Sequence, residues 1–161
     1  MSGLRVLAVA VSSGKVGYVF LVGPELQDWA VTTTVSGNTT DLVAFVQELI
    51  NTLKPDVVVT EKCDEHCRKG KRSRRLIAAI AELASHNYVL DVSLRRPRIF
   101  QSKYEEAQSM VKRHPDLIGY LPKRKRRFFD FEPRNMIVFE AVALAEAVNN
   151  GPPEKLAAAM G

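Results

Sequence analysis

Cysteine and long apolar runs are scarce in this sequence of 161 residues. Its two cysteines, Cys63 and Cys67, lie four positions apart and do not make the framework of a secreted, disulfide-stapled domain. No apolar run approaches the roughly 20 residues that cross a membrane. The run from Val6 to Val11 is also too short for the core of a secretory signal. The scarcity of both features predicts a protein of the reducing cytoplasm.

Positive charge, by contrast, is abundant and clustered. The sequence contains 23 lysines and arginines and carries a formal net charge of +5. Segment 68–75 holds six of these basic residues, segment 95–98 holds three and segment 123–127 holds five. Such clusters repel one another unless an anionic partner neutralises them, and nucleic-acid phosphate is the commonest such partner. The distribution predicts nucleic-acid binding, although a single cluster is equally typical of a solvated loop.

The length and the hydrophobic content predict one domain. A chain of this length with 46% hydrophobic residues can bury one sizeable core. Gly151-Pro152-Pro153 is typical of the end of a domain. We therefore expect a single domain over residues 1–150, followed by a loose tail over residues 151–161.

The most informative stretch follows Pro55. Val57 to Thr60 contains three valines and no polar alternation, as expected for a strand that is covered on both faces in the middle of a sheet. Glu61 comes next, at the carboxyl end of that strand, where α/β folds place their chemistry. Position alone makes Glu61 as typical of a solvated strand end as of a functional carboxylate.

The pattern before Pro55 predicts three strands and a helix. Apolar runs joined by short turns predict antiparallel strands over residues 4–11, 16–22 and 27–35. A helical apolar stripe begins at Leu42, with Thr39 or Thr40 as its cap. This helix leads to the strand that starts at Val57, so it forms a right-handed crossover between parallel strands.

The pattern after Glu61 predicts one more strand and three more helices. A helix is expected over residues 72–85 and a strand over residues 88–92. Ser102 is predicted to cap the next helix, which ends near His114. Residues 115–131 are expected to form a linker, and Pro133 is expected in the first turn of a last helix that runs to about Asn149.

This α/β order of elements resembles the ribonuclease H-like fold. Three motifs are similar to the RuvC-like Holliday-junction resolvase branch of that fold, namely Val16-Gly17-Tyr18, the segment 55–61 and the helical segment 140–145. The resemblance covers roughly residues 4–148. It implies a five-stranded mixed sheet, made of a three-stranded antiparallel meander plus parallel strands, with helices on both faces. It further implies a metal-dependent endonuclease that acts on branched DNA as a homodimer.

The resemblance also implies a metal site. In this branch, Mg²⁺ or Mn²⁺ is held by an acidic residue on the first strand, a glutamate at the end of the fourth strand and acidic residues on the last helix. Glu61 and Glu140 match two of these positions and are the catalytic and metal-binding residues that the resemblance implies. The first-strand position falls on Ala10, and no acidic residue occurs among residues 1–24. A second helix position falls on Ile137.

Glu140 favours a function on physical grounds as well. It is the only charged residue between Met136 and Ala145, and a buried carboxylate is costly unless a cation or a partner meets it. A helix rim that faces solvent is the alternative. Two carboxylates can hold Mg²⁺ weakly when substrate phosphates complete the coordination, but they are few for a two-metal mechanism. Asp130 could join them only if the preceding loop folds back. The sequence thus predicts a nuclease with a degenerate metal site, or a catalytically inactive nucleic-acid-binding module of the same fold.

The remaining candidates are a short cysteine motif and the basic residues. Cys63, His66 and Cys67 offer three soft ligands, whereas a closed zinc site needs four, so a loop with free thiols is the alternative. Aromatic residues within 128–131 could stack on exposed bases or anchor a loop to the core. The residues predicted to bind nucleic acid are Lys15, Lys69, Lys71, Arg72, Arg95, Arg96, Lys123, Arg124, Lys125, Arg126 and Arg127.

Overall fold

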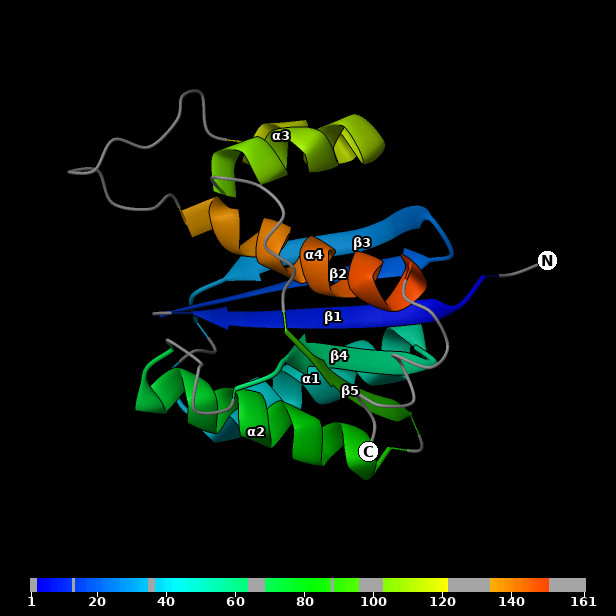
Figure 1. The fold of residues 1–161 in the computed structure, drawn as a ribbon. Helices are drawn as coiled ribbons and strands as arrows, with labels where there is room; N and C mark the ends of the chain where they lie inside the picture. Colours follow the sequence, from blue (N-terminus) through cyan, green and yellow to red (C-terminus); the bar gives the residue numbers. More distant parts are fainter. Residues whose placement is uncertain are drawn as a thin grey trace.

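The computed structural model of this chain describes residues 3–12, 14–34, 37–63, 69–87, 89–95, 103–121 and 134–150. They fold into three layers, in which a five-stranded sheet lies between two helical layers (Figure 1). The strand order is β3-β2-β1-β4-β5. This confirms the predicted mixed sheet with helices on both faces.

The first three strands form the predicted antiparallel meander. They are β1 (Arg5–Ser12), β2 (Lys15–Val22) and β3 (Glu25–Thr32). All eight residues of β1 pair with residues of β2. The register of β2 with β3 shifts once, since Phe20 pairs with Asp28 but Leu21 pairs with Leu26. Gln27 is therefore an extra residue in β3, which makes a β-bulge.

The parallel half of the sheet is built on β1. β4 (Val57–Glu61) lies parallel to β1, and β5 (Leu90–Leu94) lies parallel to β4. The first four residues of β4 have no solvent exposure. The prediction that this strand is covered on both faces is therefore confirmed.

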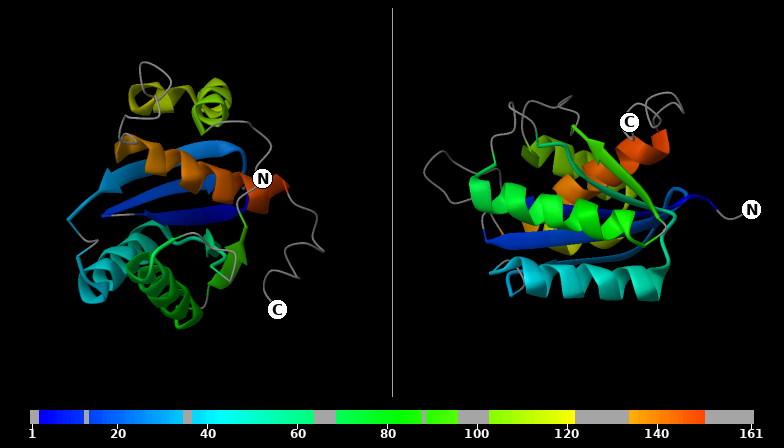
Figure 2. Two further views of the ribbon diagram at one scale, coloured as in Figure 1. Left: turned by 60° about the vertical axis from the view of Figure 1, so that its left-hand side comes forward. Right: turned by 90° about the horizontal axis from the view of Figure 1, so that it is seen from below.

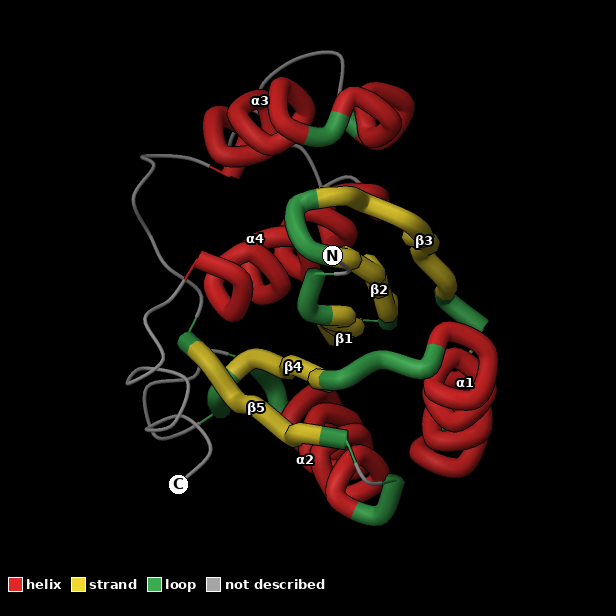
Figure 3. The backbone as a smooth tube through the Cα atoms, turned by 90° about the vertical axis from the view of Figure 1, so that its right-hand side faces the viewer, coloured by secondary structure: helices red, strands yellow, loops and turns green. Residues whose placement is uncertain are grey.

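Each face of the sheet has its own core. α1 (Thr39–Leu53) and α2 (Lys71–Ser85) cover one face, while α4 (Ile137–Asn150) covers the other, with α3 (Lys103–Arg113) outside it (Figures 2 and 3). Because strand side chains alternate, Val57 and Val59 pack in the cluster that contains α4. Val58 packs in the cluster that contains α1 and α2. None of the helices in the described ranges is long and apolar enough to cross a membrane.

Several predicted element boundaries are wrong. The N-cap of α1 is Asn38, whose side chain accepts a hydrogen bond of 2.8 Å from the backbone N–H of Asp41, and not Thr39 or Thr40. Part of the predicted linker is a 3₁₀ helix, Pro115–Tyr120. A second 3₁₀ helix, Arg134–Met136, precedes α4, so the regular last helix begins later than predicted. Ser102, Pro133 and the tail 151–161 lie outside the described residues.

Candidate functional site

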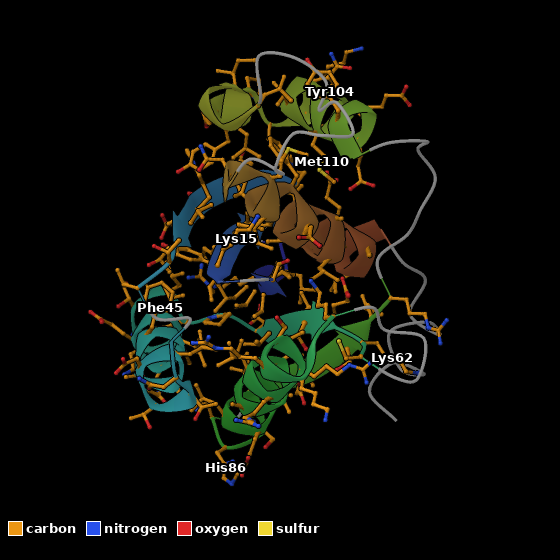
Figure 4. The ribbon with its side chains drawn as sticks, turned by 90° about the vertical axis from the view of Figure 1, so that its left-hand side faces the viewer. Lys15, Phe45, Lys62, His86, Tyr104 and Met110 are labelled. Carbon is orange, nitrogen blue, oxygen red and sulfur yellow. The ribbon has the colours of Figure 1, made fainter. Side chains whose placement is uncertain are left out.

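One end of the sheet collects the residues that the sequence singles out. Because β1, β4 and β5 are parallel, their carboxyl ends lie at the same edge, and α4 begins at that edge (Figure 1). Figure 4 looks onto this end, where Lys15 lies between α4 and the layer of α1 and α2. Glu61 is the last residue of β4. The alternation that turns Val57 and Val59 toward α4 also turns Glu61 toward α4.

Glu140 lies in the first turn of α4 and is 6% exposed. Its neighbours along the helix, Phe139 and Ala141, are buried core residues. The amino end of a helix stabilises a carboxylate, but it does not replace the water that burial removes. The predicted burial of this charge is confirmed, so a cation near Glu140 is expected.

That cation is Lys69. Its Nζ lies 3.6 Å from Oε1 of Glu140, and the two side chains are 12% and 7% exposed. Nζ also donates a hydrogen bond of 2.6 Å to the backbone carbonyl of Val11 in β1. The Lys69 carbonyl in turn accepts a hydrogen bond of 3.0 Å from Nε of Arg74 in α2. Lys69 is therefore held between the end of β1 and the start of α4.

The sheet leaves room for this contact because β1 and β4 separate early. Their pairing covers three residue pairs and ends at Ala8 and Val59. β1 continues to Ser12, so the carbonyl of Val11 lies beyond its pairing with β4 and accepts from Lys69 instead. β1 is also the strand at which the chain order reverses, and ligands of α/β sheets bind at such switch points.

The two positions at which further acidic residues would be needed are apolar. Ala10 is 4% exposed and belongs to the same cluster as Ile137 and Ala141. Ala10 pairs with Gly17 in β2, and Gly17 in turn packs against Ile137. Ala10 thus packs on the side of the sheet that α4 covers, but neither Ala10 nor Ile137 brings an oxygen ligand.

The described residues therefore do not fit a divalent metal centre. They contain no group of three or more histidine, cysteine, aspartate or glutamate side chains able to hold a metal ion. Glu140, the better buried of the two candidate ligands, already faces the ammonium group of Lys69. A positive charge at this distance opposes a second cation on the same carboxylate. Asp130, the third predicted ligand, lies outside the described residues.

Several of the predicted nucleic-acid-binding residues surround this end of the sheet. Lys15 opens β2, Lys71 and Arg72 open α2, and Arg95 follows β5. Lys71 is exposed, whereas one guanidinium nitrogen of Arg72 donates a hydrogen bond of 2.8 Å to the carbonyl of Gly37. Arg96 and the run Lys123–Arg127 lie outside the described residues.

The motif of Cys63, His66 and Cys67 was predicted either to bind zinc or to be a loop with free thiols. Cys63, the one residue of the motif that the structure describes, fits neither alternative. Cys63 is disulfide-bonded, so the expectation of a free thiol is wrong at this position. A disulfide sulfur is also not the thiolate that binds zinc. His66 and Cys67 lie outside the described residues, and the cytoplasmic location inferred from the cysteines stays a prediction.

A second polar cluster, which the sequence did not predict, fixes α4 to α3. The Glu146 carboxylate accepts hydrogen bonds of 2.8 and 2.7 Å from the Arg113 guanidinium and lies 3.1 Å from Nε2 of His114. Burial raises the pKa of Glu146, but the hydrogen bonds from His114 and Arg113 outweigh burial and lower this pKa to about 2. The cluster holds α4 in place and so supports the position of Glu140 at the other end of that helix.

Comparison with known proteins rests on structure alone. No protein-family model matches the chain, and no curated protein sequence matches it either. Thermus thermophilus RuvC in complex with a Holliday junction substrate is similar with a TM-score of 0.61 and 13% identity, over 92% of this chain and 97% of that one. The Fowlpox virus resolvase in complex with Holliday junction DNA is similar with a TM-score of 0.58 and 11% identity, over 91% of this chain and 97% of that one. The yeast mitochondrial Holliday junction resolvase is similar with a TM-score of 0.50 and 15% identity, over 91% of this chain and 82% of that one.

These likenesses define the fold of the protein. With its sheet order and its layers, the chain is an α/β protein of ribonuclease H-like fold. Its fold is similar to that of these Holliday junction resolvases, as the resemblance drawn from the sequence implied.

Proposed function

We propose that this protein binds branched or structured DNA at the carboxyl end of its parallel strands. The observation that carries the proposal is that basic residues lie around the sheet end that holds Glu61 and Glu140. They come from β2, from α2 and from the segment after β5. Lysine and arginine bind phosphate by charge and by directed hydrogen bonds, so such an end suits a nucleic-acid backbone. Two of the similar structures hold Holliday junction DNA, which supports this choice of substrate class.

Binding without cleavage is the form of this function that the side chains favour. A nuclease that relies on metal ions stabilises the charge that develops at phosphorus with those ions. Here Ala10 and Ile137 offer no ligand, and Lys69 already neutralises Glu140. The site is therefore degenerate as a metal centre, and the protein is proposed to act as a binding module.

A metal-dependent endonuclease is the second candidate. Its supporting observation is that the Glu140 carboxylate is buried on the side of the sheet toward which Glu61 points. In this form Mg²⁺ or Mn²⁺ would be held weakly by the two carboxylates and by substrate phosphate. The two candidates share DNA binding and differ in whether a phosphodiester is cut.

The test compares a four-way junction with a linear duplex of the same sequence at fixed salt. The binding module should bind the junction more tightly than the duplex and leave it intact in Mg²⁺ and in Mn²⁺. Lys71→Ser and Arg95→Ser should each weaken binding to both DNAs. Each should also make the slope of log K against log salt shallower by about 0.9, because one phosphate contact is lost. Lys112→Ser, an exposed substitution on α3, serves as the control. Equal binding of junction and duplex would overturn the choice of branched DNA, and metal-dependent cleavage would favour the second candidate.

A further inference from the structure

The ion pair of Lys69 with Glu140 lies at the carboxyl end of the parallel strands, where α/β folds bind their ligands. The cation of this pair is a side chain of the protein itself. An ammonium group is a compact positive charge with three N–H donors. One donor of Lys69 is used by the Val11 carbonyl, and the charge faces Glu140. The backbone of β1 and the first turn of α4 thus fix the position of Nζ from two directions.

We propose that the ammonium group of Lys69 takes the place of a divalent metal ion at Glu140, and that this end of the sheet binds DNA phosphate without any metal ion. The part that concerns DNA rests on the proposed function, whereas the part that concerns metal exclusion does not. The partly exposed ammonium group keeps donors for a phosphate oxygen after it has bound Val11. Lys69 is therefore both the counter-ion of Glu140 and a phosphate ligand.

Metal exclusion follows from charge. A divalent ion on Glu140 would lie within a few ångströms of the Lys69 ammonium, and like charges at that separation repel strongly where water is scarce. Since Ala10 and Ile137 supply no further carboxylate, the described residues hold no group of three ligands that would offset the repulsion. Removing the ammonium group would remove this repulsion, so that a divalent ion could approach the Glu140 carboxylate.

A purely structural ion pair has different consequences. If Lys69 served stability alone, its loss would weaken the fold without creating affinity for a metal ion. If it replaces a metal ion, its loss should produce a site that Mn²⁺ fills. The effect of Lys69→Met on Mn²⁺ binding therefore separates the two roles.

The first experiment titrates Mn²⁺ into the wild type and three variants by calorimetry, without DNA. Lys69→Met should bind Mn²⁺ about tenfold or more tightly than the wild type. Lys62→Met, which removes the same charge next to Glu61 in sequence, is the matched control and should bind like the wild type. Lys69→Met with Glu140→Gln should lose the gain. No gain in Lys69→Met, or an equal gain in Lys62→Met, would overturn the proposal.

Stability provides a second readout. Lys69→Met should unfold at a lower temperature than the wild type, and Mn²⁺ should raise its unfolding temperature more than that of the wild type. If Lys69→Met does not fold, the ¹⁵N signal of the Lys69 ammonium group decides the question. A signal protected from solvent exchange in the wild type and lost in Glu140→Gln supports the proposal, whereas no protected signal in the wild type overturns it.

The DNA part is tested with a four-way junction in EDTA, in Mg²⁺ and in Mn²⁺ at matched ionic strength. The wild type should bind equally well in all three, whereas Lys69→Met should bind more weakly in EDTA and regain affinity with Mn²⁺. A wild type that needs Mg²⁺ for binding would contradict the proposal. If the wild type binds the junction under none of these conditions, the proposed function fails, and the calorimetric result still decides whether Lys69 excludes the metal ion.

Discussion

Gly17 of β2 and Ile137, the first residue of α4, approach each other so closely that no side chain fits between them. A Cβ atom added to Gly17 would lie 2.9 Å from Cγ2 of Ile137 and 3.2 Å from its carbonyl carbon and oxygen. This contact lets α4 begin directly on the sheet. Glu140, one turn further along, is consequently carried into the buried end where Lys69 meets it.

Gly17→Ala should therefore destabilise the protein, by about 1–3 kcal/mol, because the added methyl group meets backbone atoms as well as a side chain. Gly119→Ala is the control, since a Cβ there meets nothing within 4 Å, and it should change stability by about 0.5 kcal/mol or less. Urea unfolding of both variants checks this. Equal stability of the two would mean that α4 shifts away without cost.

The Glu146 cluster predicts a dependence of stability on acid. The pKa of Glu146 is about 2 in the folded protein, below its ordinary value of 4.5, so the ionised form stabilises the fold. That contribution, about 2–3 kcal/mol, should be present above pH 4.5 and should disappear as the pH falls toward 2. Glu146→Gln should be less stable than the wild type at pH 7, and the difference should shrink in acid. Unfolding measured at pH 7, 4 and 2.5 tests this, and a difference that stays constant would contradict it.

The basic run Lys123–Arg127 is predicted to contact phosphate. Replacing three of its five residues with serine should make the slope of log K against log salt shallower by about two to three units, because each lost phosphate contact removes about 0.9. Binding of fluorescent duplex DNA at several salt concentrations measures the slope. A slope that matches the wild type would show that this run is a solvated loop.

Restoring a carboxylate on β1 should depend on Lys69. In Ala10→Asp, the new carboxylate is expected to be met by the ammonium group, so the affinity for Mn²⁺ should rise only slightly. In Ala10→Asp with Lys69→Met, three carboxylates without the ammonium group, namely Glu61, Glu140 and the introduced one, should bind Mn²⁺ more tightly than in either single variant. Calorimetry compares the three proteins, with Ala10→Asn as the uncharged control. Tight binding in Ala10→Asp alone would mean that Lys69 yields its place to the metal ion.

Much of the architecture was predictable because it follows from local patterns. Three valines without alternation indicated a central strand, and Glu61 is indeed its last residue. The lone charge in an apolar helix indicated that Glu140 is special, and it is buried. The short turns after Ser12 and Val22 indicated the meander. Each of these features depends on residues that are close together in the sequence.

The ion pair itself could not be predicted in this way. Lys69 was expected to bind nucleic acid, as one member of a basic cluster, but nothing in its surroundings in the sequence points to Glu140. Their contact depends on where β1 parts from β4 and on how closely α4 approaches Gly17. The choice of Asn38 over Thr39 as the helix cap likewise could not be predicted. Asparagine and threonine are both favoured at an N-cap, so the backbone angles decide which residue takes that position.

The bulge in β3 bears on how two copies of this chain could associate. β3 and β5 are the outer strands, and growth of a sheet by strand addition needs a long, flat and regularly paired border. β3 is interrupted at Gln27 and carries Glu25 and Asp28, while β5 is only five residues long. Neither border suits an incoming strand. Two copies are therefore expected to meet through helices or loops, which leaves each sheet a separate unit.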